Sequence, residues 1–338
     1  MPDAHEIEKA IKLLRLGEVV GIPTETVYGL AARIDIPRAI EQIFKSKERP
    51  FFDPLIVHVA SIEQAQKLTS QWGIVAQALA EDFWPGPLTM ILPKSDEINP
   101  MITSGLESVG IRMPKHPMAL EVIRELGVPL AAPSANKFGR TSPTSAFHVW
   151  NEFKDENIFV LDGGECEVGI ESTVLLVKET SIFADLSILR KGYVLASDIQ
   201  KSLLKRKIDF HFVESVSKKE SPGHMKHHYM PAIPLIVCEN KELMGDELLV
   251  EINQRLNQLP DEIESVKILK PINGVKSYAL LDLALDPVVA AREFYSELRR
   301  LGEGNFDCIV FYKEEYQRGD YWDSLFDRLN KAASLIIP

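Results

Sequence analysis

The stretch Gly21-Ile-Pro-Thr-Glu-Thr-Val-Tyr-Gly-Leu30 is the most informative part of the chain. It overlaps a short β-branched apolar run, Val19 to Ile22, which predicts a buried strand. Pro23 cannot donate a backbone hydrogen bond, and the polar triplet Thr24 to Thr26 marks the exit of that strand into a loop. Open α/β sheets bind ligands at such strand ends, so the triplet is a candidate binding site. A polar turn in an ordinary strand-to-helix connection is an equal alternative.

Outward from this stretch, apolar strands alternate with amphipathic helices, which predicts an α/β fold. Ser142 is expected to cap a helix that has Pro143 in its first position. The capping-box pair Ser61 and Gln64 predicts another helix start. Strands are expected at 19–22, 55–59, 88–92, 109–113, 130–132, 158–161, 172–177, 235–238, 266–269 and 308–312. Helices are expected at 6–16, from 37, 74–83, 117–126, 246–259, 287–300 and 322–333.

The 338 residues are enough for two domains. The segment 209–231 is polar, contains four of the eight histidines, and is interpreted as a linker. It divides a first domain, 1–208, from a second, 232–338, in which regular strand–helix alternation predicts a small and mostly parallel sheet.

Composition excludes several classes of protein. The net charge of -11 argues against a generally basic nucleic-acid-binding surface. Residues 232–338 hold 19 acidic and 12 basic side chains, against 30 and 26 in residues 1–231, which leaves room for a local basic pocket in the first domain. The apolar runs are too short to span a bilayer and the N-terminus lacks a signal pattern, so a cytoplasmic location is expected. The three cysteines, Cys166, Cys238 and Cys308, have no metal-binding spacing and are expected in the core.

Charged and titratable side chains embedded in apolar strands are the next candidates. His58 and Arg112 need partners, because an unpaired buried charge costs several kcal/mol. For Arg112 the partner is either a ligand or a core carboxylate, and for His58 a backbone hydrogen bond is the simpler explanation. Lys47 and Arg49 follow a helix, where cations also interact favourably with the helix dipole.

Two kinds of site are disfavoured by the sequence. His224, His227 and His228 have the i, i+3, i+4 spacing of a zinc site, but the flanking Pro222-Gly223 and Pro231 make a helix there doubtful. No phosphate-binding loop or dinucleotide fingerprint occurs. A nucleotide would therefore be bound by dispersed Lys, Arg, Ser and Asn side chains.

Five motifs occur in order: Pro23-Thr-Glu-Thr-Val-Tyr-Gly-Leu30, Lys47-x-Arg49-Pro50, Pro54-Leu-Ile-Val-His58, Trp84-Pro-Gly-Pro-Leu-Thr89 and Pro133-Ser-Ala-Asn136. Together they closely resemble the Sua5/YciO/YrdC family, including its paired KxR and SxN motifs. The linker Ser221-Pro-Gly-His-Met-Lys-His-His-Tyr229 and the further α/β domain resemble the two-domain Sua5 branch.

The resemblance implies a fold and an activity. The expected fold is a twisted mixed α/β sheet with a large concave cavity, the YrdC-like domain, followed by a smaller Rossmann-like domain. The expected activity is that of an L-threonylcarbamoyladenylate synthase, a nucleotidyltransferase. Such enzymes convert L-threonine, bicarbonate and ATP, with Mg²⁺, into threonylcarbamoyl-AMP and pyrophosphate. The product is passed to the tRNA threonylcarbamoyl transferase complex, which modifies adenosine 37.

The resemblance also implies the site residues, position by position. L-Threonine would contact Thr26, His58, Arg112, Ala132 and Ser172. ATP would contact Arg49, Asp53, Ser108, Ser134, Ser142, Arg190 and Tyr229. Lys47, Arg49 and Asn136 would be the catalytic residues of the KxR and SxN pair, with no metal ligand among the side chains. Glu25 receives no role.

Two departures from the family pattern bear on these assignments. Asp53 stands where the family usually has Asn, and an ionised carboxylate cannot donate hydrogen bonds. It is expected either to bind magnesium or to pair with Arg49. The linker, expected to cover the cavity as a lid, is richer in histidine than the family pattern. Two other functions stay open: a non-catalytic RNA-binding module that contacts tRNA, and a regulator that hydrolyses nucleotide.

Overall fold

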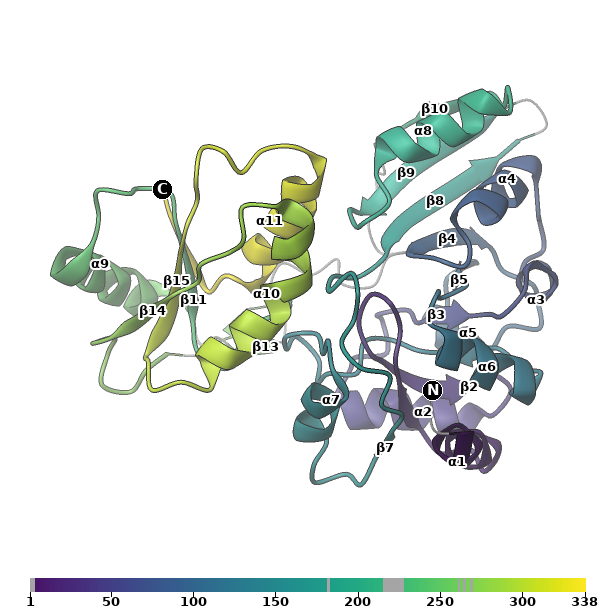
Figure 1. Ribbon diagram of the computed structural model, residues 1–338, viewed down its shortest axis with the longest axis horizontal. Coiled ribbons are helices and arrows are strands. Elements are labelled where there is room, and N and C mark those ends of the chain that lie inside the picture. Colours follow the sequence, from purple (N-terminus) through teal and green to yellow (C-terminus); the bar gives the residue numbers. More distant parts are fainter. Residues whose placement is uncertain (1–3, 181–182, 215–227, 261, 264–265, 268–269) are drawn as a thin grey trace. The chain divides into compact units, whose positions relative to one another are not determined.

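The computed structural model describes residues 4–180, 183–214, 228–260, 262–263, 266–267 and 270–338. The chain forms two compact units (Figure 1). The first comprises Met1–Lys137 and Pro143–His224, and the second comprises Phe138–Ser142 and Met225–Pro338.

The first unit contains a 10-stranded mixed sheet with the strand order β10-β9-β8-β4-β5-β3-β6-β2-β1-β7. The strands are β1 (Val20–Ile22), β2 (Gly29–Arg33), β3 (Ile56–His58), β4 (Leu88–Pro93), β5 (Ser108–Arg112), β6 (Leu130–Ala131), β7 (Phe159–Val160), β8 (Thr173–Glu179), β9 (Ala184–Arg190) and β10 (Phe210–Phe212). Helices are α1 (Ala4–Arg15), α2 (Pro37–Lys47), α3 (Ile62–Lys67), α4 (Ile74–Phe83), α5 (Pro100–Thr103), α6 (Pro117–Leu126), α7 (Ala146–Glu152) and α8 (Ala196–Lys205). The expected α/β class with a large mixed sheet is confirmed.

The opening stretch forms a strand, a loop and a second strand, and no helix follows it directly. β1 and β2 pair antiparallel, with Ile22 opposite Gly29. The strand β2 was not predicted. At Gly29 an added Cβ would lie 3.1 Å from the Cβ of Ala132, so glycine permits the close approach of the chain that follows β6.

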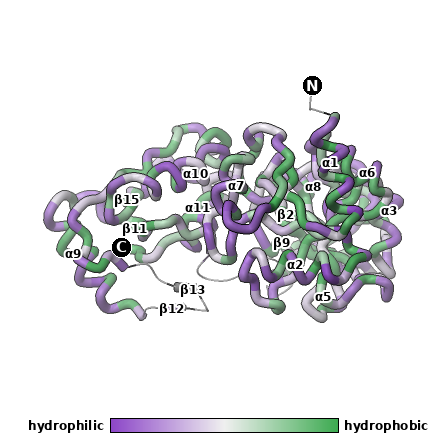
Figure 2. Tube along the Cα trace, turned by 90° about the horizontal axis from the view of Figure 1, so that it is seen from below, coloured by the Kyte–Doolittle hydropathy of each residue, from purple (hydrophilic) through white to green (hydrophobic). Residues whose placement is uncertain are grey.

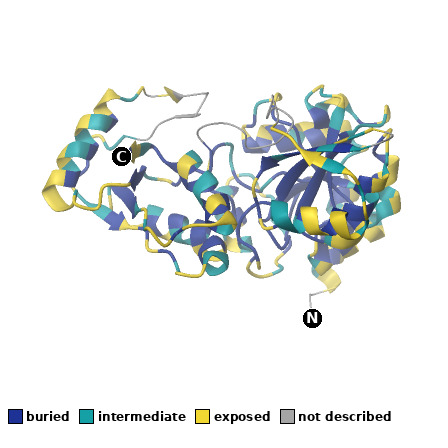
Figure 3. Ribbon diagram, turned by 90° about the horizontal axis from the view of Figure 1, so that it is seen from above, coloured by how far each residue is buried: buried dark blue, intermediate teal, exposed yellow. Residues whose placement is uncertain are grey.

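One face of this sheet packs against the helices. Each of the helices α1 to α8 contributes side chains to one large apolar core, together with strand residues such as Val57, Met90 and Ile111. The amphipathic pattern of α1 and α2 is visible as alternating hydrophilic and hydrophobic colour in Figure 2. The central strands of the sheet are buried, whereas the edge strand β10 is largely exposed (Figure 3). The opposite face carries a smaller apolar cluster that includes Ile91 and Val174.

Two predictions at the element level need correction. Ser142 does not cap a helix: α7 begins later, with the Ser145 side chain accepting a hydrogen bond from the backbone N–H of His148 at 3.3 Å. The Pro143 carbonyl instead accepts the N–H of Tyr28 at 2.9 Å, and the segment around it is not helical. The presumed linker also begins too early, because β10 pairs in parallel with β9 at the edge of the sheet. The cap at Ser61 is confirmed, since it accepts the N–H of Gln64 at 3.2 Å.

The second unit contains a four-stranded parallel sheet with the order β14-β15-β11-β16. Its elements are β11 (Leu235–Cys238), α9 (Gly245–Gln258), β14 (Tyr278–Leu280), α10 (Pro287–Gly302), β15 (Cys308–Tyr312), α11 (Asp320–Ala332) and β16 (Leu335–Ile337). The expected small parallel α/β domain is therefore confirmed, although β14 and β16 were not predicted. The predicted strand 266–269 differs: its described part, β13 (Val266–Lys267), pairs antiparallel with β12 (Glu262–Ile263).

All three cysteines are buried and unbridged. Within the described ranges, none of the helices has the length and apolarity needed to cross a membrane.

Candidate functional site

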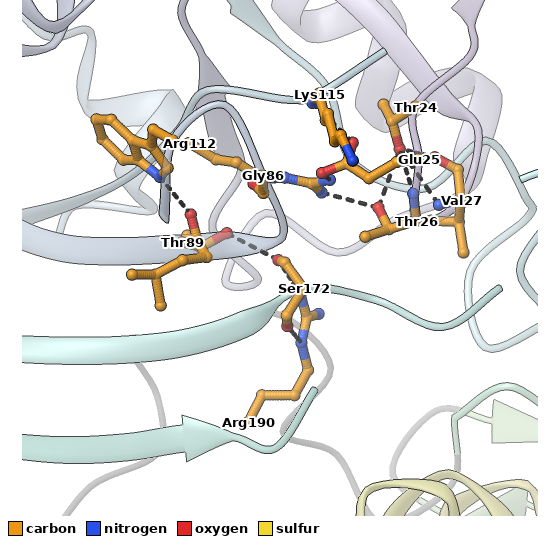
Figure 4. A network of polar contacts seen from close by, with 12 residues as sticks. Thr24, Glu25, Thr26, Val27, Gly86, Thr89, Arg112, Lys115, Ser172 and Arg190 are labelled. Carbon is orange, nitrogen blue, oxygen red and sulfur yellow. Dashed lines mark hydrogen bonds and ion pairs between the residues drawn. The ribbon is translucent and has the colours of Figure 1, made fainter. Parts of the chain in front are cut away.

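The loop between β1 and β2 is fixed by its own threonines (Figure 4). The Thr24 hydroxyl donates to the carbonyl of Val27 at 2.6 Å and accepts the backbone N–H groups of Thr26 and Val27 at 3.2 and 3.3 Å. The hydroxyls of Thr24 and Thr26 lie 2.9 Å apart. Such side-chain bonds to nearby backbone stabilise a turn. The loop is therefore preorganised.

Arg112, at the end of β5, reaches this loop. Its Nη1 donates to the Thr26 hydroxyl at 2.8 Å, and its Nε donates to the carbonyl of Gly86 at 3.3 Å. Its Nη2 lies 2.7 Å from Oε1 of Glu25, and both side chains are buried. Of the two alternatives for Arg112, the core carboxylate is present. That carboxylate belongs to Glu25, for which no role was predicted.

His58 lies beside Arg112 on the same face of the sheet. The two residues are direct partners in the parallel pairing of β3 and β5, and side chains of such partners point to the same side. Burial, and then the charge of Arg112, lower the pKa of His58 from 6.5 to about 3. His58 is therefore neutral at physiological pH. Its Nδ1 is buried and has no hydrogen-bond partner among the described residues.

Ser172 and Arg190 form a second polar group at neighbouring strand ends (Figure 4). The Ser172 hydroxyl lies 2.8 Å from that of Thr89 and accepts from Arg190 Nη2 at 3.1 Å. Arg190 Nε donates to the Ser172 carbonyl at 3.0 Å. Gly192 packs against this backbone, because an added Cβ there would lie 2.4 Å from the amide nitrogen of Thr173.

Lys47 joins the KxR and SxN motifs. Its Nζ donates to the backbone carbonyls of Ser134 and Asn136, both at 2.5 Å. Burial, and then the positive charge of Arg49, lower the pKa of Lys47 well below its ordinary value. Lys137 adds a more exposed salt bridge between the same two segments, with its Nζ 3.0 Å from a carboxylate oxygen of Glu48. The end of α2 and the loop after β6 are thus fastened together.

Arg49 and Asp53 form a buried ion pair at 2.9 Å. Arg49 also donates to the carbonyls of Asp53 and Pro54, at 3.1 and 2.8 Å. Of the two expectations for Asp53, pairing with Arg49 is the one found. The pairing of Ile56 with Gly110 places Ser108 level with Pro54, so Ser108 belongs to this end of the sheet, about 13 Å along β5 from Arg112.

The remaining candidates are placed as follows. Ala132 lies directly after β6 and donates its N–H to the carbonyl of Ile56 at 3.0 Å. Ser142 and Tyr229 are buried in the second unit, where the Thr141 hydroxyl donates to the Tyr229 carbonyl at 3.2 Å. The greater part of the expected lid, 215–227 with two of the histidines considered for zinc, lies outside the described residues. His228 is described and packs edge-on against the ring of Tyr229 at 4.3 Å.

Two members of these groups were missed from the sequence. Thr89 was quoted only as part of a motif, although strand alternation places it on the same face as Ile91 and hence on the face opposite the helices. Glu25 could be recognised only through its contact with Arg112, 87 positions away in the chain. Over the described ranges, no group of three or more His, Cys, Asp or Glu side chains is arranged to hold a metal ion.

Comparison with known proteins supplies the family. The family model described as "Telomere recombination" (Sua5/YciO/YrdC) matches residues 12–192. A second model, described as "Threonylcarbamoyl-AMP synthase, C-terminal domain", matches residues 194–334.

Individual relatives match nearly the whole chain. Proteins named threonylcarbamoyl-AMP synthase from Bacillus subtilis and Pyrococcus abyssi are 39% and 35% identical, each over 97% of this chain and over 93% and 94% of their own lengths. The solved structure "Crystal structure of P. abyssi Sua5 complexed with L-threonine" has a TM-score of 0.79 and 33% identity, over 98% of this chain and 96% of that one. A second solved structure, of a doubly substituted variant of P. abyssi Sua5, has a TM-score of 0.78 and 32% identity over 98% and 94% of the two chains. The chain belongs to the Sua5/YciO/YrdC family, in its two-domain Sua5 branch.

Proposed function

We propose that this protein is an L-threonylcarbamoyladenylate synthase, a nucleotidyltransferase that forms threonylcarbamoyl-AMP and pyrophosphate from L-threonine, bicarbonate and ATP. One observation carries the proposal: the relative solved with L-threonine superimposes over 98% of this chain. The buried arginine at the end of β5 supports it, because a guanidinium is suited to a carboxylate. The product would serve the threonylcarbamoyl modification of adenosine 37 in tRNA.

The amino-acid substrate is proposed to lie at Thr26, His58, Arg112, Ala132 and Ser172. Arg112 offers N–H groups to the carboxylate of threonine. His58, neutral and with an unpartnered Nδ1 in the described part of the chain, offers a hydrogen bond without adding charge. Such a site recognises an amino acid by hydrogen-bond donors and acceptors in fixed positions. A ligand that lacks the matching groups leaves these buried polar atoms unpaired, which is costly.

ATP is proposed to contact Arg49, Asp53, Ser108, Ser134, Ser142, Arg190 and Tyr229. Lys47, Arg49 and Asn136 are the proposed catalytic residues. Lys47 and Arg49 would offset negative charge as pyrophosphate leaves, and Lys47 also holds the backbone at Ser134 and Asn136 in position. The pairing of Asp53 with Arg49 supports a role in orienting that guanidinium.

No protein nucleophile is needed for this reaction. The threonine amine combines with bicarbonate to give a carbamate and water. A carbamate oxygen then attacks the α-phosphorus of ATP, and the bond to pyrophosphate breaks. Mg²⁺ is proposed to enter on the phosphates of ATP, since it commonly binds through phosphates and few carboxylates, and Asp53 is already paired with Arg49. The protein would contribute positioning and electrostatic stabilisation.

The test is pyrophosphate release by the purified chain with each substrate omitted in turn. We expect release only when L-threonine, bicarbonate and ATP are all present, together with a product of the mass of threonylcarbamoyl-AMP. ATP consumption that is indifferent to threonine would instead identify a nucleotide hydrolase. Salt-sensitive tRNA binding without any threonine-dependent turnover would identify an RNA-binding module.

A further inference from the structure

Glu25 lies at the centre of the polar loop but has been given no role in substrate binding. Its side chain is 3% exposed. Its Oε2 accepts the backbone N–H of Lys115 at 3.0 Å, and its carbonyl accepts the N–H of Val168 at 2.8 Å. Two segments distant in sequence therefore fix this residue in place. A carboxylate held in this way is a rigid element of the site.

The contact between Glu25 and Arg112 is an ion pair that does not use up the donors of the guanidinium. The Nη2 and Oε1 atoms are 2.7 Å apart, yet neither makes an aligned hydrogen bond among the described residues. A guanidinium has five N–H groups. One points to Gly86 and one to Thr26, so three N–H groups of Arg112 are not aligned on an acceptor within the described ranges. Buried donors of this kind are costly unless a ligand pairs with them.

We propose that Glu25 is a positioning residue for the amino-acid substrate: it anchors the guanidinium of Arg112 by charge and leaves the Nη2 donors for the substrate carboxylate. This inference rests on the proposed function. Thr26 and Gly86 accept hydrogen bonds from Nη1 and Nε of Arg112. The ion pair of Nη2 with Glu25 is the third contact, and the three together fix the orientation of the guanidinium. The paired charges of Glu25 and Arg112 also cancel, so a zwitterionic amino acid enters without leaving net charge buried.

Neither close analogue of glutamate reproduces this arrangement. Glutamine has one acceptor and one donor group, so its amide would direct a donor at either Arg112 or the N–H of Lys115. Aspartate keeps the charge, but its chain is one methylene shorter. Both substitutions therefore weaken the anchor while changing the volume little.

The experiment measures threonine-dependent pyrophosphate release by the full chain and by Glu25→Gln and Glu25→Asp. We expect the KM for L-threonine to rise about tenfold or more in both variants, because the guanidinium of Arg112 loses the buried ion pair that holds it in place. The KM for ATP should stay within about twofold. KM does not depend on the fraction of folded enzyme, so a partly unstable variant still gives the result. An unchanged or lower KM for threonine would overturn the proposal.

A matched control uses another carboxylate in an ion pair. Asp82 accepts from Ser202 at 2.6 Å and pairs with Arg206, between α4 and α8. Asp82→Asn should lower the unfolding temperature and leave the KM for threonine unchanged. If Asp82→Asn raised the KM for threonine as much as Glu25→Gln does, the rise would follow from the loss of any ion pair in this domain. That result would count against a positioning role for Glu25.

The route through Arg112 is tested by a double-mutant cycle. The Arg112→Lys variant has no planar guanidinium for Glu25 to position. Adding Glu25→Gln to this variant should therefore raise its KM for threonine by less than a further twofold. A full tenfold rise in that background would show that Glu25 acts independently of Arg112 and would overturn the proposal. If the wild-type chain releases no pyrophosphate with threonine, the proposed function fails, which is distinct from failure at Glu25.

Discussion

His58 is an uncharged hydrogen-bonding group because of where it is buried. Its neighbour across the strand pair is Arg112, whose charge adds to the cost of protonating a buried imidazole. Since the pKa is lowered to about 3, the folded protein leaves His58 unprotonated over the whole range in which an ordinary histidine titrates.

This lowered pKa predicts a pH-dependent stability. Between about pH 6 and pH 4 the unfolded chain binds a proton at this position and the folded chain does not. The free energy of unfolding should therefore fall as the pH falls, with His58 contributing about 1.4 kcal/mol per pH unit. The free energy of unfolding of wild type and of His58→Gln can be measured with denaturant at several pH values in this range. Its dependence on pH should be shallower in the variant, by the equivalent of about one proton bound on unfolding. Above pH 7.5 the two slopes should agree, and parallel curves throughout would contradict the assignment.

Lys47 gives a second prediction. Lys47→Met preserves the length of the side chain but leaves the carbonyls of Ser134 and Asn136 without their donor. We expect the free energy of unfolding to fall by about 2 kcal/mol and the KM for ATP to rise. Lys45→Met, on the exposed face of the same helix, is the control and should change neither. Equal effects of the two substitutions would show that the hydrogen bonds of Lys47 do not stabilise the contact between the KxR and SxN motifs.

At the scale of residues, the cost of burying a charge in an apolar strand predicted that Arg112 and His58 need partners, but it could not identify them. Glu25 is brought to Arg112 by a loop whose path depends on Thr24, Lys115 and Val168. Such contacts link distant parts of the chain, and no local pattern in one sequence determines them.

Secondary-structure elements were predictable where the apolar pattern was long. The strand β2, Gly29-Leu-Ala-Ala-Arg33, contains no β-branched residue, and it forms because β1 and β6 pair with its two edges. The helix predicted from Ser142 had an acceptable cap and a proline in the first position. It does not form there, because the Pro143 carbonyl bonds to Tyr28 and a second serine starts the helix later.

The position of this helix start predicts a measurable cap. Ser145→Ala should lower the free energy of unfolding by about 1 kcal/mol, since the N–H of His148 loses its acceptor. Ser145→Asp should restore the stability, because aspartate is an equally good cap. Identical thermal unfolding of wild type and Ser145→Ala would argue that α7 does not begin here.

At the scale of the whole molecule, the alternation of strands and helices was enough to predict the α/β class and a second, parallel-sheet domain. It did not locate the end of the first sheet. β10 has a polar, aromatic sequence, and it is recognisable as part of the sheet only from its pairing with β9 and from the bond between the Val213 N–H and the Leu186 carbonyl at 2.9 Å.

Two truncations test this boundary. A chain ending at residue 214 keeps β10, and a chain ending at residue 208 loses it and leaves β9 as an open edge. We expect the longer fragment to be more stable by about 2 kcal/mol, from its backbone hydrogen bonds, and to stay monomeric at higher concentration. Equal unfolding midpoints and equal solubility would favour a domain end at 208.

The segment Phe138–Ser142 has a consequence for how such proteins can be recombined. It begins two residues after Asn136 of the SxN motif, yet it is built into the second unit. Met230 bonds to Gly139 and Thr141 through the backbone, and Arg299 of α10 donates to the Thr141 carbonyl. The second unit is therefore encoded by two separate stretches of the gene. A chimaera that exchanges the C-terminal part between relatives must also exchange these five residues. Otherwise the transferred part will lack the segment that it packs against.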